Sequence, residues 1–176
     1  MAKKGEIRVG IVGFGFMGRM HYGNWKKMKG ARVVALCDQN LAQFTAPTAG
    51  GNIAGADTTT DYGDAVIYDD FDKMLAEADL DAISLTLPTP LHVPLTIKAL
   101  QAGVSVLCEK PMALNAAECD KMLKAANRAP EGTKLMVAHC LRFWPSYVYL
   151  KKLVDSKKYG KVIAASFRRF SAPPGW

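Results

Sequence analysis

Three glycines with a fixed spacing, Gly13, Gly15 and Gly18, are followed twenty residues after Gly18 by an acid, Asp38. In a G-x-G-x-x-G pattern the first glycine permits a tight turn, the second lets the backbone approach a pyrophosphate, and the third allows close helix packing. A helix that starts here directs unpaired N–H groups and a positive dipole end at phosphate oxygens. A carboxylate at the end of the next strand can accept both hydroxyls of a ribose. These residue types therefore suit the binding of a dinucleotide.

The segments around the glycines decide between a dinucleotide site and a glycine-rich turn that occurs by chance. Residues 6–12 are an apolar run with the composition of a short strand, and they lead directly into Gly13. Residues 16–29 have a helical pattern, and residues 31–37 form a second apolar run that ends at Asp38. Because strand, glycines, helix, strand and acid follow in the required order, we favour the dinucleotide site. The cofactor-binding residues predicted from this motif are Gly13, Phe14, Gly15, Phe16, Met17, Gly18 and Asp38.

The type of dinucleotide depends on the acid. Asp38 would repel the 2′-phosphate of NADP, and the next residue is Gln39 rather than an arginine that could receive that charge. We therefore predict NAD as the cofactor, with NADP less favoured.

A second set of reactive residue types follows another apolar run, at Glu109-Lys110-Pro111. Near a nicotinamide, the Lys110 ammonium could donate a hydrogen bond to a substrate oxygen and stabilise developing alkoxide charge, while Glu109 holds the lysine in place. The alternative is a surface Glu–Lys pair before a turn proline, and the tripeptide alone favours this alternative.

The elements that must position these residues alternate between strands and helices. Beyond the first two strands, we predict strands at 65–68, 81–86, 104–108 and 134–139, with helices at 71–78, 91–102 and 115–127. This alternation is typical of the Rossmann type of α/β fold, a doubly wound parallel sheet with helices on both faces. Its ligands bind at the carboxyl ends of the strands, so the glycines, Asp38, residues 86–92, 109–111 and 139–142 should share one edge.

The chain changes character after residue 144. A helix at 146–157 and a strand at Val162–Phe170 are predicted to begin a second, α+β domain, so we assign residues 1–144 to the dinucleotide-binding domain and 145–176 to the start of the second. The stretch Thr45–Thr60, rich in Gly, Ala and Thr, is predicted to be a long mobile loop.

Composition excludes several classes of protein. The net charge is +7, but the basic residues are scattered and no basic run has interleaved aromatics, so we expect no nucleic-acid partner. No apolar stretch approaches the ~20 residues that cross a bilayer, and the N-terminus leads directly into the first strand without a signal peptide. The four cysteines lack C-x-x-C spacing. We therefore expect no metal site and no disulfide, and a cytoplasmic location.

Taken together, these motifs resemble the glucose–fructose oxidoreductase/inositol dehydrogenase (Gfo/Idh/MocA) family over nearly the whole chain. The segments that carry the resemblance are the glycine motif with His21, Asp81–Ser84, Pro88–His92, Ala99–Gly103, Glu109–Pro111 and Arg142–Pro145. The resemblance implies that Lys110 is catalytic. It also implies that the strand-end turn 86–92 lines the nicotinamide side of the pocket and that the chain leads into a substrate domain after Arg142.

The resemblance completes the predicted site. Further cofactor contacts are assigned to Thr86, Pro88, His92, Glu109 and Lys110, and substrate contacts to His139 and Arg142. From the residues alone, His92 is split evenly between pocket lining and a structural polar contact. His139 is split in the same way between a substrate or nicotinamide contact and a backbone partner, and His21 is favoured as a packing or capping residue. The general base usual in the family, a histidine of the second domain, would lie beyond residue 176, and the 45–60 loop is longer than the family leads us to expect.

The implied activity is that of a dehydrogenase, an NAD(P)-dependent oxidoreductase that moves hydride between nicotinamide and a secondary alcohol of a sugar or polyol. The rival is a non-catalytic dinucleotide sensor or regulatory protein on the same fold. Lys110 favours the enzyme, because a sensor does not need it. In the resembled family the second domain commonly builds the oligomer interface, so a homo-oligomer is expected, and turnover requires residues beyond 176.

Overall fold

The computed structural model describes residues 5–45, 61–168 and 170. The predicted loop Thr45–Thr60 lies outside this part of the chain except for Thr45. The strands are β1 (Ile7–Val12), β2 (Ala31–Cys37), β3 (Val66–Tyr68), β4 (Ala82–Leu85), β5 (Ser105–Cys108) and β6 (Leu135–Val137). The helices are α1 (Phe16–Lys27), α2 (Phe71–Glu77), α3 (His92–Gln101), α4 (Ala116–Arg128) and α5 (Pro145–Ser156), with short 3-10 helices η1 (Leu41–Phe44), η2 (Thr89–Leu91) and η3 (Cys140–Phe143).

The six strands form one parallel sheet in the order β3-β2-β1-β4-β5-β6. The chain moves outward in one direction from β1 to β3 and then returns to β4 on the other side of β1. The order therefore reverses between β1 and β4, which is where doubly wound sheets open a crevice at their carboxyl edge. The Rossmann fold predicted from the alternating elements is confirmed.

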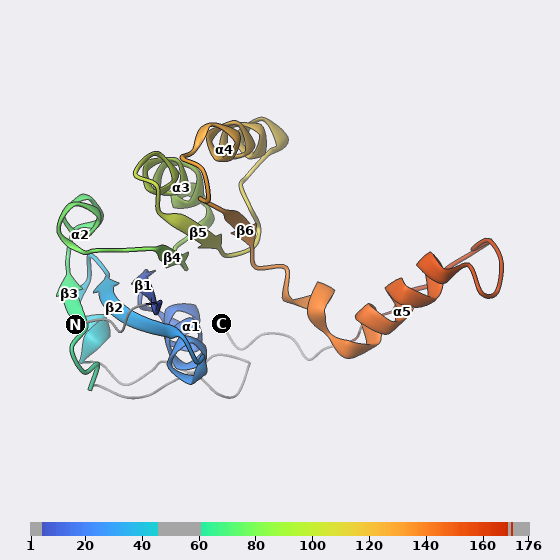
Figure 1. Cartoon of the computed structure of the whole chain (residues 1–176), viewed down its shortest axis with the longest axis horizontal. Helices are drawn as coiled ribbons and strands as arrows, with labels where there is room; N and C mark the ends of the chain where they lie inside the picture. The colour runs from blue at the N-terminus through green and yellow to red at the C-terminus, as the bar shows by residue number, and fades with distance from the viewer. Residues whose placement is uncertain (1–4, 46–60, 169, 171–176) are drawn as a thin grey trace. The chain divides into compact units, whose positions relative to one another are not determined.

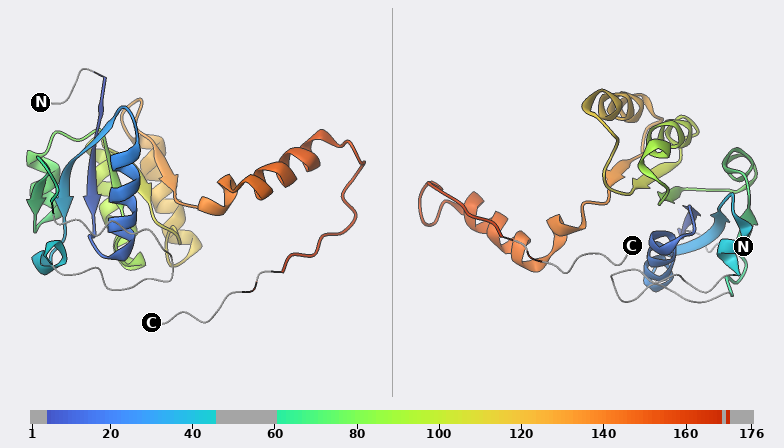
Figure 2. Two further views of the ribbon diagram at one scale, coloured as in Figure 1. Left: turned by 90° about the horizontal axis from the view of Figure 1, so that it is seen from below. Right: turned by 180° about the vertical axis from the view of Figure 1, so that it is seen from behind.

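Helices cover both faces of this sheet (Figure 1). Helix α1 lies on one face, and α2, α3 and α4 lie on the other; Figure 2 shows the same layers from two further sides. Each face has its own core. The larger one includes Met74, Leu100 and Met122 under the three helices, and the smaller one is aromatic, with Phe14, Tyr22 and Phe44 under α1.

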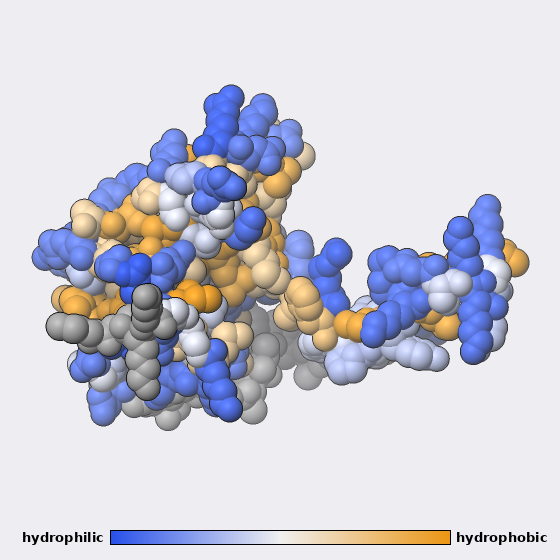
Figure 3. Space-filling view, viewed as in Figure 1, coloured by the Kyte–Doolittle hydropathy of each residue, from blue (hydrophilic) through white to orange (hydrophobic). Residues whose placement is uncertain are grey.

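Local sequence features explain where the helices start and stop. The Asn115 side chain accepts a hydrogen bond from the Glu118 N–H (3.0 Å) and so caps α4, and Asp70 caps α2 in the same way from the Lys73 N–H (2.7 Å). Gly103, with φ of 77°, follows the end of α3 as a left-handed cap. Hydrophilic side chains gather over the outer surface of α4, whose inner side buries Met122 (Figure 3). Capping side chains and a left-handed glycine thus set the limits of these helices.

The chain divides into two compact units, Met1–Ala138 and His139–Trp176. The second contains η3 and α5, and its α5 begins at Pro145. The strand predicted at Val162–Phe170 is wrong for this structure, because residues 162–168 and 170 lie in no strand. A strand needs a neighbour that pairs its N–H and C=O groups, and β-propensity does not supply one. In the part of the second unit that the structure describes, these side chains are exposed, with Ile163 at 98%.

Candidate dinucleotide-binding site

The glycine turn joins β1 to α1, and of its three motif glycines only Gly15 has open space beside it in the described part of the chain. Gly13 has a φ of +86°, and a Cβ there would lie 2.9 Å from the carbonyl oxygen of Thr86. A Cβ on Gly18 would lie 2.0 Å from the carbonyl oxygen of Gly13, so this glycine lets α1 pack against the turn. A Cβ on Gly15 would meet nothing within 4 Å among the described residues. Gly15 therefore leaves the open approach that a pyrophosphate needs, and the turn fits a dinucleotide.

The start of α1 offers donors rather than a side-chain cap. Gly15 is its N-cap, no side chain hydrogen-bonds the cap, and no acidic residue stands in the first turn. Phe16 and Met17, both half-buried, form that first turn. Backbone N–H groups at an uncapped helix start attract anions, so this end of α1 suits phosphate oxygens.

Asp38 stands directly after β2, and both of its oxygens are held by the backbone. Oδ2 accepts the N–H of Phe14 (2.7 Å) and Oδ1 accepts the N–H of Asn40 (2.8 Å). Each carboxylate oxygen has further acceptor capacity. The carboxylate is thus fixed beside the glycine turn, where it can accept ribose hydroxyls.

Phe14 differs from its neighbours in the motif. Its side chain is completely buried, with ring centroids 4.9 Å from Phe44 and 5.8 Å from Tyr22, and its N–H is donated to Asp38. Phe14 therefore shapes the turn from the core side, while the open side of the turn belongs to Gly15 and the start of α1.

The end of β4 supports the glycine turn. The Thr86 hydroxyl lies 2.7 Å from the carbonyl oxygen of Gly13 and 2.9 Å from that of Val12, and the Thr86 N–H donates to Val12 O (2.8 Å). A single hydroxyl proton can serve either carbonyl. Pro88, two residues on, is exposed at this edge. Thr86 thus fixes the turn at the place where the strand order reverses.

His92 is buried, with 1% of its surface exposed. Its Nδ1 lies 2.9 Å from the carbonyl oxygen of Pro111, and its Nε2 lies 2.8 Å from that of Leu87. Of the two roles weighed from the sequence, these contacts favour the structural one, because each ring nitrogen lies within hydrogen-bond distance of a backbone carbonyl oxygen. His92 therefore links the turn after β4 to the segment after β5.

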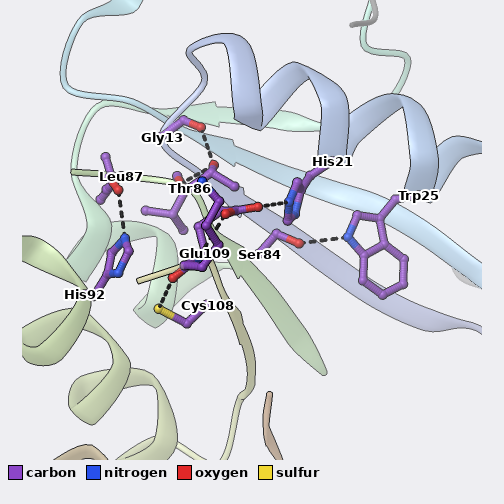
Figure 4. Close-up of polar contacts among 11 residues, drawn as sticks. Gly13, His21, Trp25, Ser84, Thr86, Leu87, His92, Cys108 and Glu109 are labelled. Atoms are coloured by element: carbon purple, nitrogen blue, oxygen red, sulfur yellow. Dashed lines mark hydrogen bonds and ion pairs between the residues drawn. The ribbon is translucent and has the colours of Figure 1, made fainter. Parts of the chain in front are cut away.

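Glu109 and Lys110 follow β5 and have opposite environments. Glu109 is 8% exposed; its Oε1 lies 3.0 Å from Nε2 of His21 on α1, and its Oε2 accepts the N–H of Lys110 (2.9 Å) (Figure 4). Burial alone would raise the pKa of Glu109, but the hydrogen bonds from His21 and Lys110, with their charges, outweigh it and lower that pKa. Lys110 itself is exposed. A buried carboxylate thus holds the backbone of an exposed lysine at the carboxyl edge of the sheet.

The sequence did not predict the partner of His21, which we expected to pack or cap. Glu109 is 88 residues away along the chain. The two residues meet only because β1, β4 and β5 are neighbours in the parallel sheet, which brings α1 beside the end of β5.

Nothing in the sequence indicated the environment of Arg19. Its side chain is buried, at 2% exposure, and its guanidinium carbon lies 5.2 Å from the centre of the Phe14 ring. Nη2 of Arg19 donates to the carbonyl oxygen of Gln43.

The two predicted substrate residues belong to the second unit. His139 immediately precedes η3, Arg142 lies within it, and both are exposed.

Among the described residues, no cluster of three or more His, Cys, Asp or Glu could hold a metal ion. The described helices include none with the length and apolarity to cross a membrane.

This arrangement has counterparts among known proteins. Residues 7–139 match the family model GFO_IDH_MocA, described as an oxidoreductase family with an NAD-binding Rossmann fold. The chain belongs to the Gfo/Idh/MocA family. The resemblance inferred from the glycine motif and Glu109-Lys110-Pro111 is thereby confirmed, and the fold is an NAD-binding one.

Relatives in the Gfo/Idh/MocA family include dehydrogenases of polyols. The chain is 33% identical to inositol 2-dehydrogenase 4 of Saccharopolyspora erythraea over 175 residues, 97% of this chain and 48% of that protein. It is 32% identical to 2,7-anhydro-N-acetylneuraminate hydratase of Mediterraneibacter gnavus, over 94% of this chain and 39% of the relative. A crystal structure of scyllo-inositol dehydrogenase from Lactobacillus casei with NAD(H) and scyllo-inositol has a TM-score of 0.75 and 29% identity, covering 88% of this chain and 42% of that one. The chain spans about half the length of the relatives it matches, and none of these relatives supports the non-catalytic sensor.

Proposed function

We propose that the whole protein is an NAD-dependent dehydrogenase that oxidises a secondary alcohol of a sugar or polyol. The observation that carries this proposal is the exposed Lys110 at the carboxyl edge of the sheet, whose backbone N–H donates to the buried carboxylate of Glu109. NAD, when bound, supplies the hydride acceptor. Support for the substrate class comes from relatives named as inositol 2-dehydrogenase and D-apiose dehydrogenase.

The residues of this chain divide the task. The N–H groups at the start of α1 and the open side of Gly15 would hold the pyrophosphate, and Asp38 would accept the ribose hydroxyls. Lys110 would donate a hydrogen bond to the substrate hydroxyl oxygen and stabilise the negative charge that grows there as the proton leaves. Substrate contacts from His139 and Arg142 are part of the proposal.

Turnover with a panel of sugars and polyols tests this function. In the whole protein, reduction of NAD is followed at the absorbance of the reduced cofactor. Lys110→Ala should lower kcat by about a hundredfold or more and leave the Kd of NAD within about threefold, because the phosphates are held elsewhere. The matched control is Lys124→Ala, which removes an exposed lysine of α4 that has no role in the proposed site. This variant should behave as wild type. Equal loss of turnover and of NAD affinity in Lys110→Ala would contradict the assigned role.

We also propose the wider organisation expected from the sequence. Residues 1–144 form the dinucleotide-binding domain, and residues 145–176 begin a second domain through which the whole protein forms a homo-oligomer. Light scattering of the whole protein tests the oligomer, and a measured mass equal to that of one chain would contradict it.

The four cysteines are free thiols, and this supports the proposal of a cytoplasmic location.

A further inference from the structure

The two residues that flank Lys110 are each tied by a histidine from a different helix. Glu109, before it, meets His21 of α1, and Pro111, after it, meets His92 at the start of α3. We propose that His21 and His92 are positioning residues that fix Lys110 relative to the glycine turn. The proposal rests on the catalytic role given to Lys110 above and assigns the two histidines a part in it.

The first of these two contacts is made by His21 of α1, the helix that follows the glycine turn. His21 lies three residues after Gly18, so it moves with the helix whose start would receive the phosphates. Its Nε2–H can donate to Oε1 of Glu109, while the other carboxylate oxygen accepts the N–H of Lys110. His21 and Glu109 are nearly buried, with 11% and 10% of their side chains exposed. Figure 4 shows the contact between His21 and Glu109. Through the same carboxylate it links α1 to the backbone of Lys110.

The second contact is made by His92, which follows the turn after β4 and lies between Leu87 and Pro111. Carbonyl oxygens only accept hydrogen bonds, so a neutral His92 ring can donate to Leu87 or to Pro111, and a protonated ring can donate to both. In either state the ring fills the space between the two segments at 1% exposure. Pro111 is therefore held against the same turn, residues 86–88, that supports Gly13 through Thr86.

Simple packing does not require this pattern. Buried polar side chains are usually hydrogen-bonded, most often to backbone or water, so one such contact would need no special explanation. Here both converge on the residues beside one exposed lysine, from opposite sides of the sheet. A displacement of about 1 Å at a catalytic group can cost about a hundredfold in rate, so two fixed flanks have a direct use.

Trp25 provides a matched control within the same helix. Its Nε1–H donates to Oγ of the buried Ser84 (2.8 Å), so it also connects α1 to the sheet. Trp25 lies four residues after His21, and its partner Ser84 does not flank Lys110. His21→Ala and Trp25→Phe each remove one hydrogen bond between α1 and a strand or strand end. His21→Gln restores an N–H that can donate to Glu109.

The first measurement is amide hydrogen exchange at Lys110 in the chain of 176 residues. We expect His21→Ala to speed exchange about tenfold or more, the factor that corresponds to loss of a hydrogen bond to a charged group. Trp25→Phe should change it less than about twofold, and His21→Gln should recover part of the protection. Equal acceleration in His21→Ala and Trp25→Phe would reduce His21 to a general support of the helix and overturn the proposal.

The second measurement is turnover in the whole protein. We expect His21→Ala to lower kcat about tenfold to a hundredfold with the Kd of NAD within about threefold. Unchanged kcat in His21→Ala, with kcat lost in Lys110→Ala, would overturn the positioning role and leave the proposed function intact. Unchanged kcat in Lys110→Ala would overturn the proposed function instead. His92→Phe, which keeps the ring volume and removes both nitrogens, should add to the loss; the His21 variants decide the outcome if it does not fold.

Discussion

The backbone N–H of Phe14 donates to Oδ2 of Asp38 at 2.7 Å, so the glycine turn and the acid of the motif are joined without a ligand. The two residues come from the ends of neighbouring strands, β1 and β2. A ribose and a pyrophosphate that arrive together would meet an acceptor and donors already set at a fixed separation. Such preorganisation lowers the entropy lost on binding.

Asp38 should determine the choice between NAD and NADP. We expect the chain to bind NAD more tightly than NADP, because a 2′-phosphate would face the fixed carboxylate. Asp38→Asn should narrow the difference between the two Kd values about tenfold, since it removes the charge. Titrations of both reduced cofactors by fluorescence measure this, and tighter binding of NADPH to the wild-type chain would refute it.

Two glycine substitutions should separate folding from binding. Gly18→Ala places a Cβ 2.0 Å from a backbone oxygen and should lower the free energy of unfolding by about 2–3 kcal/mol. Gly15→Ala meets nothing within 4 Å in the described structure, so its cost to stability should stay within about 1 kcal/mol. Its methyl group would occupy the approach to the pyrophosphate, and NAD affinity should fall about tenfold or more. Urea unfolding and NADH titration measure the pair; similar stability losses would contradict it.

The ion pair between Arg8 and Asp81 should give an acid-dependent part of the stability. Arg8 donates to both oxygens of Asp81, at 2.8 and 2.9 Å, and these hydrogen bonds lower the pKa of Asp81 below 3.8. A carboxyl with a lowered pKa stabilises the fold above 3.8 and loses that contribution as the pH falls through its folded value. Asp81→Asn should therefore lower the Tm by about 1–4 °C at pH 7. The difference should shrink to nothing in strong acid, and a difference that persists there would show another cause.

The four thiols should react in a fixed order. Cys140 is exposed and Cys119 half-buried, whereas burial chiefly raises the pKa of Cys37 to about 12 and that of Cys108 to about 11. Because the thiolate is the reactive form, a disulfide reagent at pH 8 should label Cys140 first and Cys119 more slowly. Cys37 and Cys108 should react only after unfolding. Mass spectrometry of the labelled peptides checks the order.

The sequence was sufficient to predict the parallel sheet, the glycine turn and the position of Asp38 directly after β2, because the order of elements and the spacing of these residues are local features. Gly13, Gly15 and Gly18 have tasks set by backbone geometry within a few residues. The pairing of His21 with Glu109 depends on where two distant elements meet, which no local pattern encodes. The strand predicted at Val162–Phe170 failed for the same reason, since its apolar residues specify a propensity and not a partner.

The burial of Phe14 has a consequence for thermal behaviour. Its ring packs in the aromatic cluster with Tyr22, Phe44 and Tyr62. Its backbone N–H donates to Asp38, the residue proposed to bind the ribose. If this cluster loosens, the turn formed by Phe14 should be released with it, so we expect that face to melt and nucleotide affinity to be lost at the same temperature. By mass action, a bound nucleotide would in turn delay the heat-induced opening of aromatic rings that it never touches.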